Sequence, residues 1–189
     1  MRFIRLAVFG SLLASAAAFA APSPAVSFFA SAAPGAALSA EAGSDAAVSA
    51  AASADLGAVI GGGRLTAIIR AGAFKQAASA YTDAWTRYRG FFGLSLAAGP
   101  SLAFLEPGRL ELRLLAGGAL ARYDLSYSYF AFPYIEPGAS YRVAMLDDRF
   151  SLRLGLSLPV YFRADALSFG ARAVAELRYA SPRRAEPAP

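Results

Sequence analysis

The feature that most constrains this chain is a two-residue alternation between large apolar side chains and small or charged ones. It is clearest from Phe150 to Arg163, where Phe, Leu and Val occupy one set of alternate positions and mostly Ser, Gly, Arg and Tyr occupy the other. Successive side chains of a β-strand point to opposite faces, so this segment predicts a strand with one apolar and one polar face. Residues 167–179 repeat the pattern, with Arg172, Glu176 and Arg178 on the polar face.

Turn-forming residues divide the chain into eight such strands. Gly61-Gly62-Gly63, Glu106-Pro107-Gly108 and Asp147-Asp148 supply residues that accept positive φ or preset a tight turn. Longer connections at 75–88 and 123–133 alternate with these tight turns. This is expected for a barrel that has short turns at one end and long loops at the other. The expected strands cover residues 36–42, 46–60, 65–75, 90–105, 109–123, 134–146, 149–163 and 167–179.

The first twenty residues have the pattern of a signal peptide. Arg2 and Arg5 precede an apolar core from Leu6 to Leu13, and Ala18-Phe19-Ala20 is a small-x-small cleavage site. This core is shorter than the ~20 residues that a membrane-spanning helix needs. The pattern therefore favours a cleaved signal peptide over an uncleaved membrane anchor.

These features divide the chain into four parts. Residues 1–20 are expected to be the signal peptide and 36–180 the barrel. We expect residues 21–35 to form an extended leader. The alternatives are that they extend the first strand, with Pro34-Gly35 as a break, or that they fold against the barrel. Residues 181–189 are rich in proline and charge, which is typical of a disordered tail.

Alternation alone fits a soluble barrel as well as a membrane barrel, in which the apolar face is turned outward. A polar face of small residues suits the crowded interior of a narrow barrel, and a signal peptide delivers the chain to the compartment from which outer-membrane barrels insert. Aromatic residues near strand ends suggest an interfacial girdle. The small residues of the polar face are Ser49, Ser53, Gly57, Gly93, Ser95, Gly99, Gly155 and Ser157. One aromatic group consists of Tyr81, Trp85, Tyr88, Phe91 and Phe92. The other consists of Tyr123, Tyr127, Tyr129, Phe130, Phe132 and Tyr134. The predicted fold class is all-β: a closed antiparallel up-and-down transmembrane β-barrel of about eight strands in the bacterial outer membrane.

The segment from Pro133 to Tyr141 carries a family resemblance. Its sequence, Pro-Tyr-Ile-Glu-Pro-Gly-Ala-Ser-Tyr, resembles a middle strand of small outer-membrane barrels of the OmpA, OmpX and OmpW kind, with a proline-tyrosine start and a glycine-x-x-tyrosine continuation. The expected strand count, mature length and loop alternation agree with that kind over most of residues 36–179. The chain departs from it after Tyr179, the position at which such proteins usually end, because ten residues follow.

Charged residues on the polar faces predict an ion-pair network inside the barrel. Counting back from Asp147-Asp148 places Arg142 opposite Arg153, and a hairpin turning around Ala164-Asp165 places Arg153 opposite Glu176. Neighbouring guanidinium groups repel, so a carboxylate within reach is required. The other predicted members are Asp55 near Arg70 or Arg64, Glu111 beside Arg113, and Arg172.

This network has two interpretations. It is either a gate or selectivity ring, or a charge plug that fills the interior. Eight strands enclose only enough room for side chains, which favours the plug.

The long connections carry aromatic residues that are candidates for outside contacts. Large aromatic side chains contribute most per residue at interfaces, so they are candidate anchors for a surface ligand. The alternative is that they lie at the lipid boundary. The residues are Trp85, Tyr88, Tyr127, Tyr129 and Phe130.

Residues that support catalysis are scarce. The chain has no cysteine and no histidine, which removes thiolate chemistry and the commonest general base and metal ligand. A Ser79–Lys75 pair would need a buried lysine, whereas Lys75 is expected at a solvated loop edge. Carboxylates and basic residues are too scattered to indicate a metal site or a nucleic-acid surface. We expect no enzyme activity, cofactor, metal or nucleic-acid partner.

The leading functional prediction is a non-enzymatic outer-membrane barrel that is structural, displays aromatic loops at the surface, or both. Its expected partners are outer-membrane lipid, the barrel-assembly machinery and surface or host ligands. Two alternatives stay open: a narrow channel or transporter for small solutes, apolar ones included, and a soluble periplasmic ligand-binding barrel.

Overall fold

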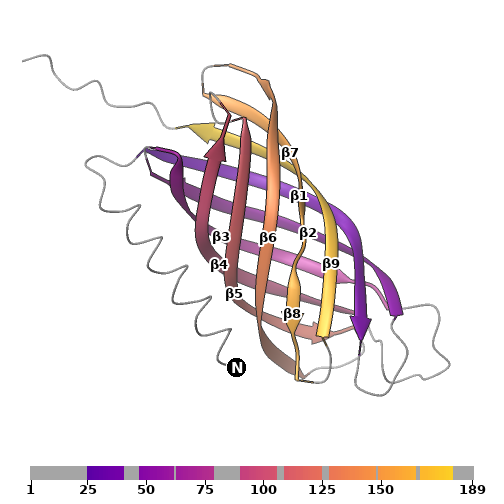
Figure 1. The fold of residues 1–189 in the computed structure, drawn as a ribbon. Coiled ribbons are helices and arrows are strands. Elements are labelled where there is room, and N and C mark those ends of the chain that lie inside the picture. Colours follow the sequence, from indigo (N-terminus) through magenta and orange to yellow (C-terminus); the bar gives the residue numbers. More distant parts are fainter. Residues whose placement is uncertain are drawn as a thin grey trace, which may run out of the picture.

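The computed structural model describes residues 25–40, 47–61, 63–78, 90–105, 109–124, 128–147, 149–164 and 167–180. They form one antiparallel sheet in which the first and last strands pair, so the sheet closes into a ring (Figure 1). Within these ranges, no helix is long and apolar enough to span a membrane. The strands are β1 (Val26–Ala40), β2 (Ala47–Ile60), β3 (Leu65–Gln76), β4 (Phe91–Phe104), β5 (Leu110–Tyr123), β6 (Tyr129–Met145), β7 (Phe150–Ser157), β8 (Val160–Phe162) and β9 (Leu167–Ala180).

Strands β7 and β8 are two parts of one strand. Both lie between β6 and β9, and their pairing register with those neighbours is the same before and after the break. The break falls at Leu158 and Pro159. Proline has no N–H, so Pro159 cannot donate to the ladder at this point. Counted as one strand, β7 and β8 give the expected eight-stranded barrel.

The first strand begins ten residues earlier than expected. β1 starts at Val26 and pairs with β2 on one side and β9 on the other. The leader interpretation is therefore wrong for residues 26–35, and the alternative of an extended first strand is right. A shorter strand would leave backbone groups of β2 and β9 without partners. The predicted signal peptide and the predicted tail lie outside the described residues.

Strand β6 also begins earlier than expected, at Tyr129 instead of 134. The connection predicted at 123–133 is accordingly shorter, because β5 ends at Tyr123. The other strands begin and end within one residue of their predicted bounds.

The two faces of the barrel wall point as predicted. In β7, Leu154 and Leu156 are 47% and 62% exposed on the outside, whereas Arg153 and Ser157 are buried inside. Inward glycines let neighbouring strands approach closely. A Cβ atom at Gly117 would lie 1.9 Å from the carbonyl oxygen of Leu96. This crowding explains why small residues occupy so much of the inner face.

The predicted aromatic girdle holds for Phe92 and Tyr129, which are exposed on the outer face, but not for the other described residues of the predicted set. Phe91, Tyr123, Phe130, Phe132 and Tyr134 point into the barrel, where they form part of the core or pack against it. The girdle interpretation is wrong for these five. Exposed aromatic residues do lie near both ends of the strands: Phe28, Phe104 and Phe150 at one end, and Phe92, Tyr129 and Phe169 at the other.

Candidate functional site in the barrel lumen

The inward side chains divide the lumen into two zones along the barrel axis. We call the end that carries the tight connections at 61–64, 105–109 and 146–149 the turn end, and the opposite end the loop end. Aromatic rings gather at the loop end, and charged side chains occupy the middle and the turn end, where the buried Phe29, Val59 and Ile68 also lie.

The loop-end zone, here called the aromatic cluster, is centred on the fully buried Phe91. Four rings surround Phe91, with centroid distances of 5.9 to 6.5 Å and edge-to-face angles. The guanidinium of Arg163 lies 5.1 Å from the Phe91 ring centroid and donates a 2.9 Å hydrogen bond to the hydroxyl of Tyr123. These contacts pack the lumen across its width. The cluster consists of Phe74, Phe91, Tyr123, Phe130, Phe132, Tyr134 and Tyr161.

The middle of the lumen is organised by Arg70. Its two terminal nitrogens donate hydrogen bonds of 2.7 and 2.6 Å to the carboxylate of Glu136, which lies across the barrel on β6. One of them also donates to the hydroxyl of Tyr134 at 3.1 Å. Its Nε lies 3.7 Å from a carboxylate oxygen of Asp55. Arg172 donates a hydrogen bond to the hydroxyl of Tyr161 and completes this layer.

The turn-end layer is built on two glutamates that are each shared by two arginines. Glu176 lies 3.1 Å from Arg113 and 2.6 Å from Arg178. Glu111 lies 2.7 Å from Arg178 and 3.5 Å from Arg153. The most exposed of these side chains, Arg178, is only 12% exposed. Each carboxylate is thus held by more than one charge-assisted contact, as buried charges require.

The two predicted register pairs are confirmed: Arg142 lies opposite Arg153, and Arg153 lies opposite Glu176. Yet Arg153 reaches Glu111 on β5, and Glu176 binds Arg113 from the same strand. Glu111 and Arg113 therefore share a strand but bind different partners. Asp55 lies beside Arg70 and not Arg64, which is exposed in the β2–β3 turn.

Four members of the network were not predicted from the sequence: Glu136, Arg178, Tyr134 and Tyr161. Glu136 binds Arg70, and Arg178 joins Glu111 to Glu176. Alternation had already placed Arg178 on the polar face of residues 167–179, and it could also have identified Glu136, which lies on the inward face of its strand. Their partners could not be predicted, since the contacts from β3 to β6 and from β9 to β5 join strands that are not neighbours.

The predicted aromatic anchor residues lie in different parts of the molecule. Trp85, Tyr88 and Tyr127 lie outside the described residues. Tyr129 is 66% exposed on the outer face of β6. Phe130 is not a loop residue: it faces the lumen and stacks on Tyr123, with a centroid distance of 4.5 Å.

No protein-family model matches the chain, and no curated protein matches its sequence. Solved structures resemble it. The attachment invasion locus protein Ail of Yersinia pestis superposes with a TM-score of 0.52 at 14% identity, covering 81% of this chain and 98% of Ail. Neisserial surface protein A gives a TM-score of 0.51 at 15% identity, covering 84% of this chain and 99% of that protein. The chain has the fold of a small outer-membrane β-barrel. A second structure, of Ail with the heparin analogue sucrose octasulfate, gives a TM-score of 0.51 at 12% identity and covers 82% of this chain and 99% of Ail.

The described residues offer little to catalysis or metal binding. Among them, no three His, Cys, Asp or Glu side chains are grouped closely enough to hold a metal ion. Lys75 lies 3.2 Å from Asp124, with 60% of its side chain exposed. This exposed side chain lacks the buried setting that a serine–lysine pair needs. Ser79, its predicted partner, lies outside the described residues.

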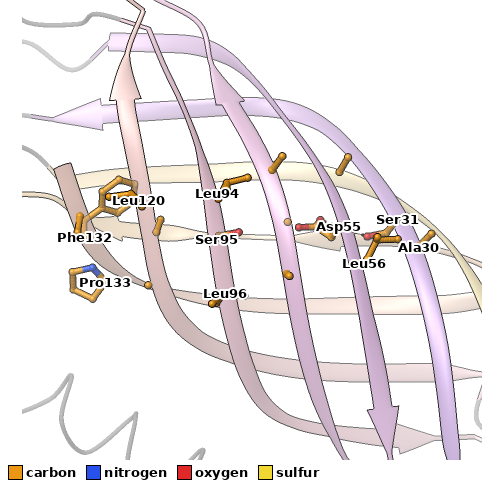
Figure 2. A pocket seen from close by; sticks show the side chains of 17 residues that line it. Ala30, Ser31, Asp55, Leu56, Leu94, Ser95, Leu96, Leu120, Phe132 and Pro133 are labelled. Carbon is orange, nitrogen blue, oxygen red and sulfur yellow. Dashed lines mark hydrogen bonds between the residues drawn. The ribbon is translucent and has the colours of Figure 1, made fainter. Parts of the chain in front are cut away.

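An apolar groove of about 1200 Å³ lies on the outer wall, across β1 to β6. Figure 2 shows Leu56, Leu94 and Leu96 among its lining side chains. These leucines are 67%, 67% and 68% exposed, so the groove opens away from the lumen. Its polar lining residues are Ser31, Asp55 and Ser95, of which Asp55 already lies beside Arg70 in the lumen network, so the groove is not part of the site.

Proposed function

We propose that this chain is a non-enzymatic barrel of the bacterial outer membrane that displays its long loops at the cell surface and does not conduct solutes. The observation that carries the proposal is the packed lumen. Seven aromatic side chains occupy the loop end, and buried ion pairs cross the middle and the turn end. An eight-stranded barrel has room for its own side chains and little else.

The outer face supports a location in lipid. Leu, Phe and Val cover it, whereas Arg and Glu are buried inside. A soluble barrel would need the opposite arrangement, so these faces argue against a periplasmic binding barrel. In outer-membrane barrels the short turns lie on the periplasmic side, which would put the turn end in the periplasm and the loop end outside. Export through the predicted signal peptide and insertion by the barrel-assembly machinery are part of the proposal.

The channel alternative is disfavoured by the contacts within the lumen. Conduction would require a continuous water-filled path. The aromatic cluster and the Arg70–Glu136 pair both lie across such a path, and the second joins opposite walls with bonds of 2.6 and 2.7 Å. Substrate passage would therefore require buried charges to separate, at a cost of several kcal/mol.

Surface display suggests binding to an external ligand. Ail has been crystallised with the heparin analogue sucrose octasulfate, so a barrel of this fold can bind a polyanion. For the present chain, the connections from 77 to 90 and from 124 to 128 are the proposed ligand-contacting regions. The ion-paired Lys75 and Asp124 lie at their bases.

Protease accessibility on intact cells tests this proposal. A protease site is inserted near residue 83 in one variant and near residue 62 in its matched control. Cleavage of the first and protection of the second are expected. Both variants must show heat-modifiable migration in detergent gels, which reports a folded barrel. Protection of residue 83, or cleavage at residue 62 instead, would contradict outward display.

Planar bilayer recordings test the second part of the proposal. Purified protein that runs as a folded barrel should produce no steady channels. Regular single-channel steps that disappear when the barrel is unfolded would favour the transport alternative.

A further inference from the structure

The apolar groove on the outer wall runs obliquely along the barrel. Figure 2 shows its lining from Phe132 and Pro133 at one side to Ala30 and Ser31 at the other. Phe132 lies three residues after Tyr129, where β6 begins at the loop end, whereas Ser31 lies nine residues before Ala40, where β1 ends there. The groove therefore starts near the loop end and descends toward the middle of the wall. One unbroken row of paired residues follows it across six strands: Phe132, Ala119, Ser95, Gly72, Asp55 and Ser31.

The outward side chains along the groove differ in size from strand to strand. Leu94, Leu96 and Leu120 stand out from β4 and β5 and are 67%, 68% and 52% exposed. Ala73 on β3 and Gly118 on β5 lie beside them. A Cβ atom added at Gly118 would meet no atom within 4 Å, so this position opens on free space. A hollow between apolar ridges on an exposed wall is suited to a hydrocarbon chain.

A row of polar and aromatic side chains lies directly beyond the groove, toward the loop end. Two residues along a strand span roughly 7 Å, so this row adjoins the outward lining residues Ala73, Leu94, Leu120 and Ala131. The row and the groove are therefore parts of one continuous surface. The row, here called the Arg122 row, consists of the register-paired residues Lys75, Phe92, Arg122 and Tyr129.

Arg122 is the member of this row best placed to bind an anion. Its guanidinium carbon lies 4.9 Å from the centroid of the Phe92 ring, and its Nε makes no hydrogen bond. A cation–π contact holds the guanidinium by its face, whereas the N–H donors point outward from its edge. Lys75, by contrast, already contacts Asp124 at 3.2 Å. Tyr129 lies beside Arg122 in the register and is 66% exposed.

We propose that the groove and the Arg122 row bind one phosphorylated lipid of the leaflet at the loop end, with an acyl chain in the groove and the phosphate at Arg122 and Tyr129. Hydrocarbon would meet the apolar lining, and the phosphate would meet a guanidinium that donates paired N–H groups. The two parts follow the order of a membrane lipid, because the groove descends from the level of the Arg122 row into the apolar band. The inference rests on the proposed function, since it takes the outer wall to lie in lipid.

Native mass spectrometry of the full chain, folded in dodecyl maltoside, tests the proposal. The probe is dimyristoyl phosphatidic acid. Its matched comparison is dimyristoyl glycerol, which has the same two chains and no phosphate. Saturable retention of one phosphatidic acid per barrel is expected, with weaker retention of the diacylglycerol. Every variant must show heat-modifiable migration, which reports a folded barrel.

A first pair of variants tests the groove. Gly118→Leu places a side chain in the free space and should weaken retention of both lipids about tenfold. Its matched control is Ala173→Leu, at an exposed position of β9 that does not line the groove. The control should retain both lipids as the wild type does.

A second pair tests the phosphate contact. Arg122→Gln should weaken retention of phosphatidic acid about tenfold, the change expected for one lost charge-assisted contact, and leave the diacylglycerol unaffected. Arg122→Lys should recover part of the loss. The matched control is Arg64→Gln, which removes an exposed arginine at the turn end and should change neither lipid.

Several results would overturn the proposal. One is a folded barrel that retains no phosphatidic acid. Equal effects of Gly118→Leu and Ala173→Leu would mean that lipid coats the whole wall, and no effect of Arg122→Gln would remove the phosphate contact. Dimers that Gly118→Leu abolishes, in place of lipid-bound monomers, would make the groove an interface between two copies. The proposed surface function fails separately, through loop accessibility and conductance, neither of which depends on lipid retention in detergent.

Discussion

The loop end and the turn end of the lumen are built on the same alternation but filled by different chemistry. At the loop end, the inward positions carry rings that pack edge-to-face or stacked around Phe91. At the turn end, they carry arginines and glutamates joined at 2.6 to 3.5 Å. Both zones close the barrel, yet they do so by interactions that respond differently to the loss of one member.

This difference concerns what remains after a side chain is removed. An aromatic ring contributes through its own buried area and contacts, so its loss leaves a cavity and intact neighbours. A buried ion contributes mainly by compensating its partners. Its loss leaves those partners charged, desolvated and unpaired. The ion-pair zone should therefore be the more sensitive to single substitutions.

The largest effect is expected for Glu176→Gln. The neutral amide removes the charge shared by Arg113 and Arg178, in a side chain that is 1% exposed. Breaking a buried pair in this way costs about 3–5 kcal/mol. Urea unfolding in detergent, followed by the heat-modifiable gel shift, measures the loss. A mutation of nearly the same size and shape makes the result a test of charge and not of packing.

The matched control for Glu176→Gln is Lys75→Gln, which breaks an exposed ion pair of 3.2 Å with Asp124. Exposed pairs contribute about 0–1 kcal/mol, so this variant should unfold almost like the wild type. If Glu176→Gln lowered the free energy of unfolding as little as Lys75→Gln, water in the lumen would be solvating the arginines that lost their partner. The contrast between the two zones would then be lost.

A smaller loss is expected for Phe91→Ala in the aromatic cluster. Phe91 is fully buried between four rings. Truncation of a buried phenylalanine costs about 3–5 kcal/mol, and we expect about 3 kcal/mol because the remaining rings can shift into the space. The same urea titration measures it, and Phe91→Leu should recover more than half of the loss.

Phe91→Ala also sharpens the comparison in planar bilayers. The ion pair between Arg70 and Glu136 remains in this variant, so the barrel should produce no channel current. Channel steps in Phe91→Ala, but not in Phe91→Leu, would mean that the aromatic cluster alone closes the lumen.

The fold was largely predictable from the sequence because alternation is a local signal. It assigned the lipid-facing and inward sides of β7 and β9 correctly, and turn residues fixed most strand bounds within one position. The first ten residues of the first strand were missed because its outward positions are mostly alanine and proline, as in Ala32, Pro34 and Ala36. A contrast in side-chain size was absent there, although the backbone pairing on both sides defines the strand.

The candidate site was only half predictable, for a different reason. Register arithmetic depends on adjacent strands, and it placed Arg142, Arg153 and Glu176 correctly. Ion pairs across a lumen depend on barrel diameter and side-chain length, which alternation does not encode. Arg70 with Glu136, and Arg113 with Glu176, are of this kind. The inward aromatic residues were misassigned because strand-end position suggests a girdle, whereas parity within the strand decides the face.

The smallest effect is expected at the turn end, outside the lumen, for Asp147→Asn. Hydrogen bonds from the backbone N–H groups of Arg149 and Phe150 hold the pKa of Asp147 below its usual value of 3.8. A lowered pKa in the folded state means that the ionised carboxylate stabilises the fold above its usual pKa. That contribution is lost as the pH falls through the lowered value. The amide oxygen of the Asn variant can still accept the hydrogen bonds from the backbone N–H groups of Arg149 and Phe150. The amide does not titrate in this pH range, so its contribution to stability does not change with pH.

The difference in unfolding midpoint between wild type and Asp147→Asn should therefore be constant from pH 7 to pH 5 and shrink below about pH 4. Taking this difference cancels the titration of the lumen glutamates, which both proteins share. Added salt separates the causes, since backbone hydrogen bonds persist at high ionic strength whereas long-range attraction to the exposed arginines of the turn end, Arg64, Arg109 and Arg149, is screened. A difference that grows as the pH falls would mean that Asp147 is stabilised in its protonated form, and the backbone hydrogen bonds would not be the source of its effect.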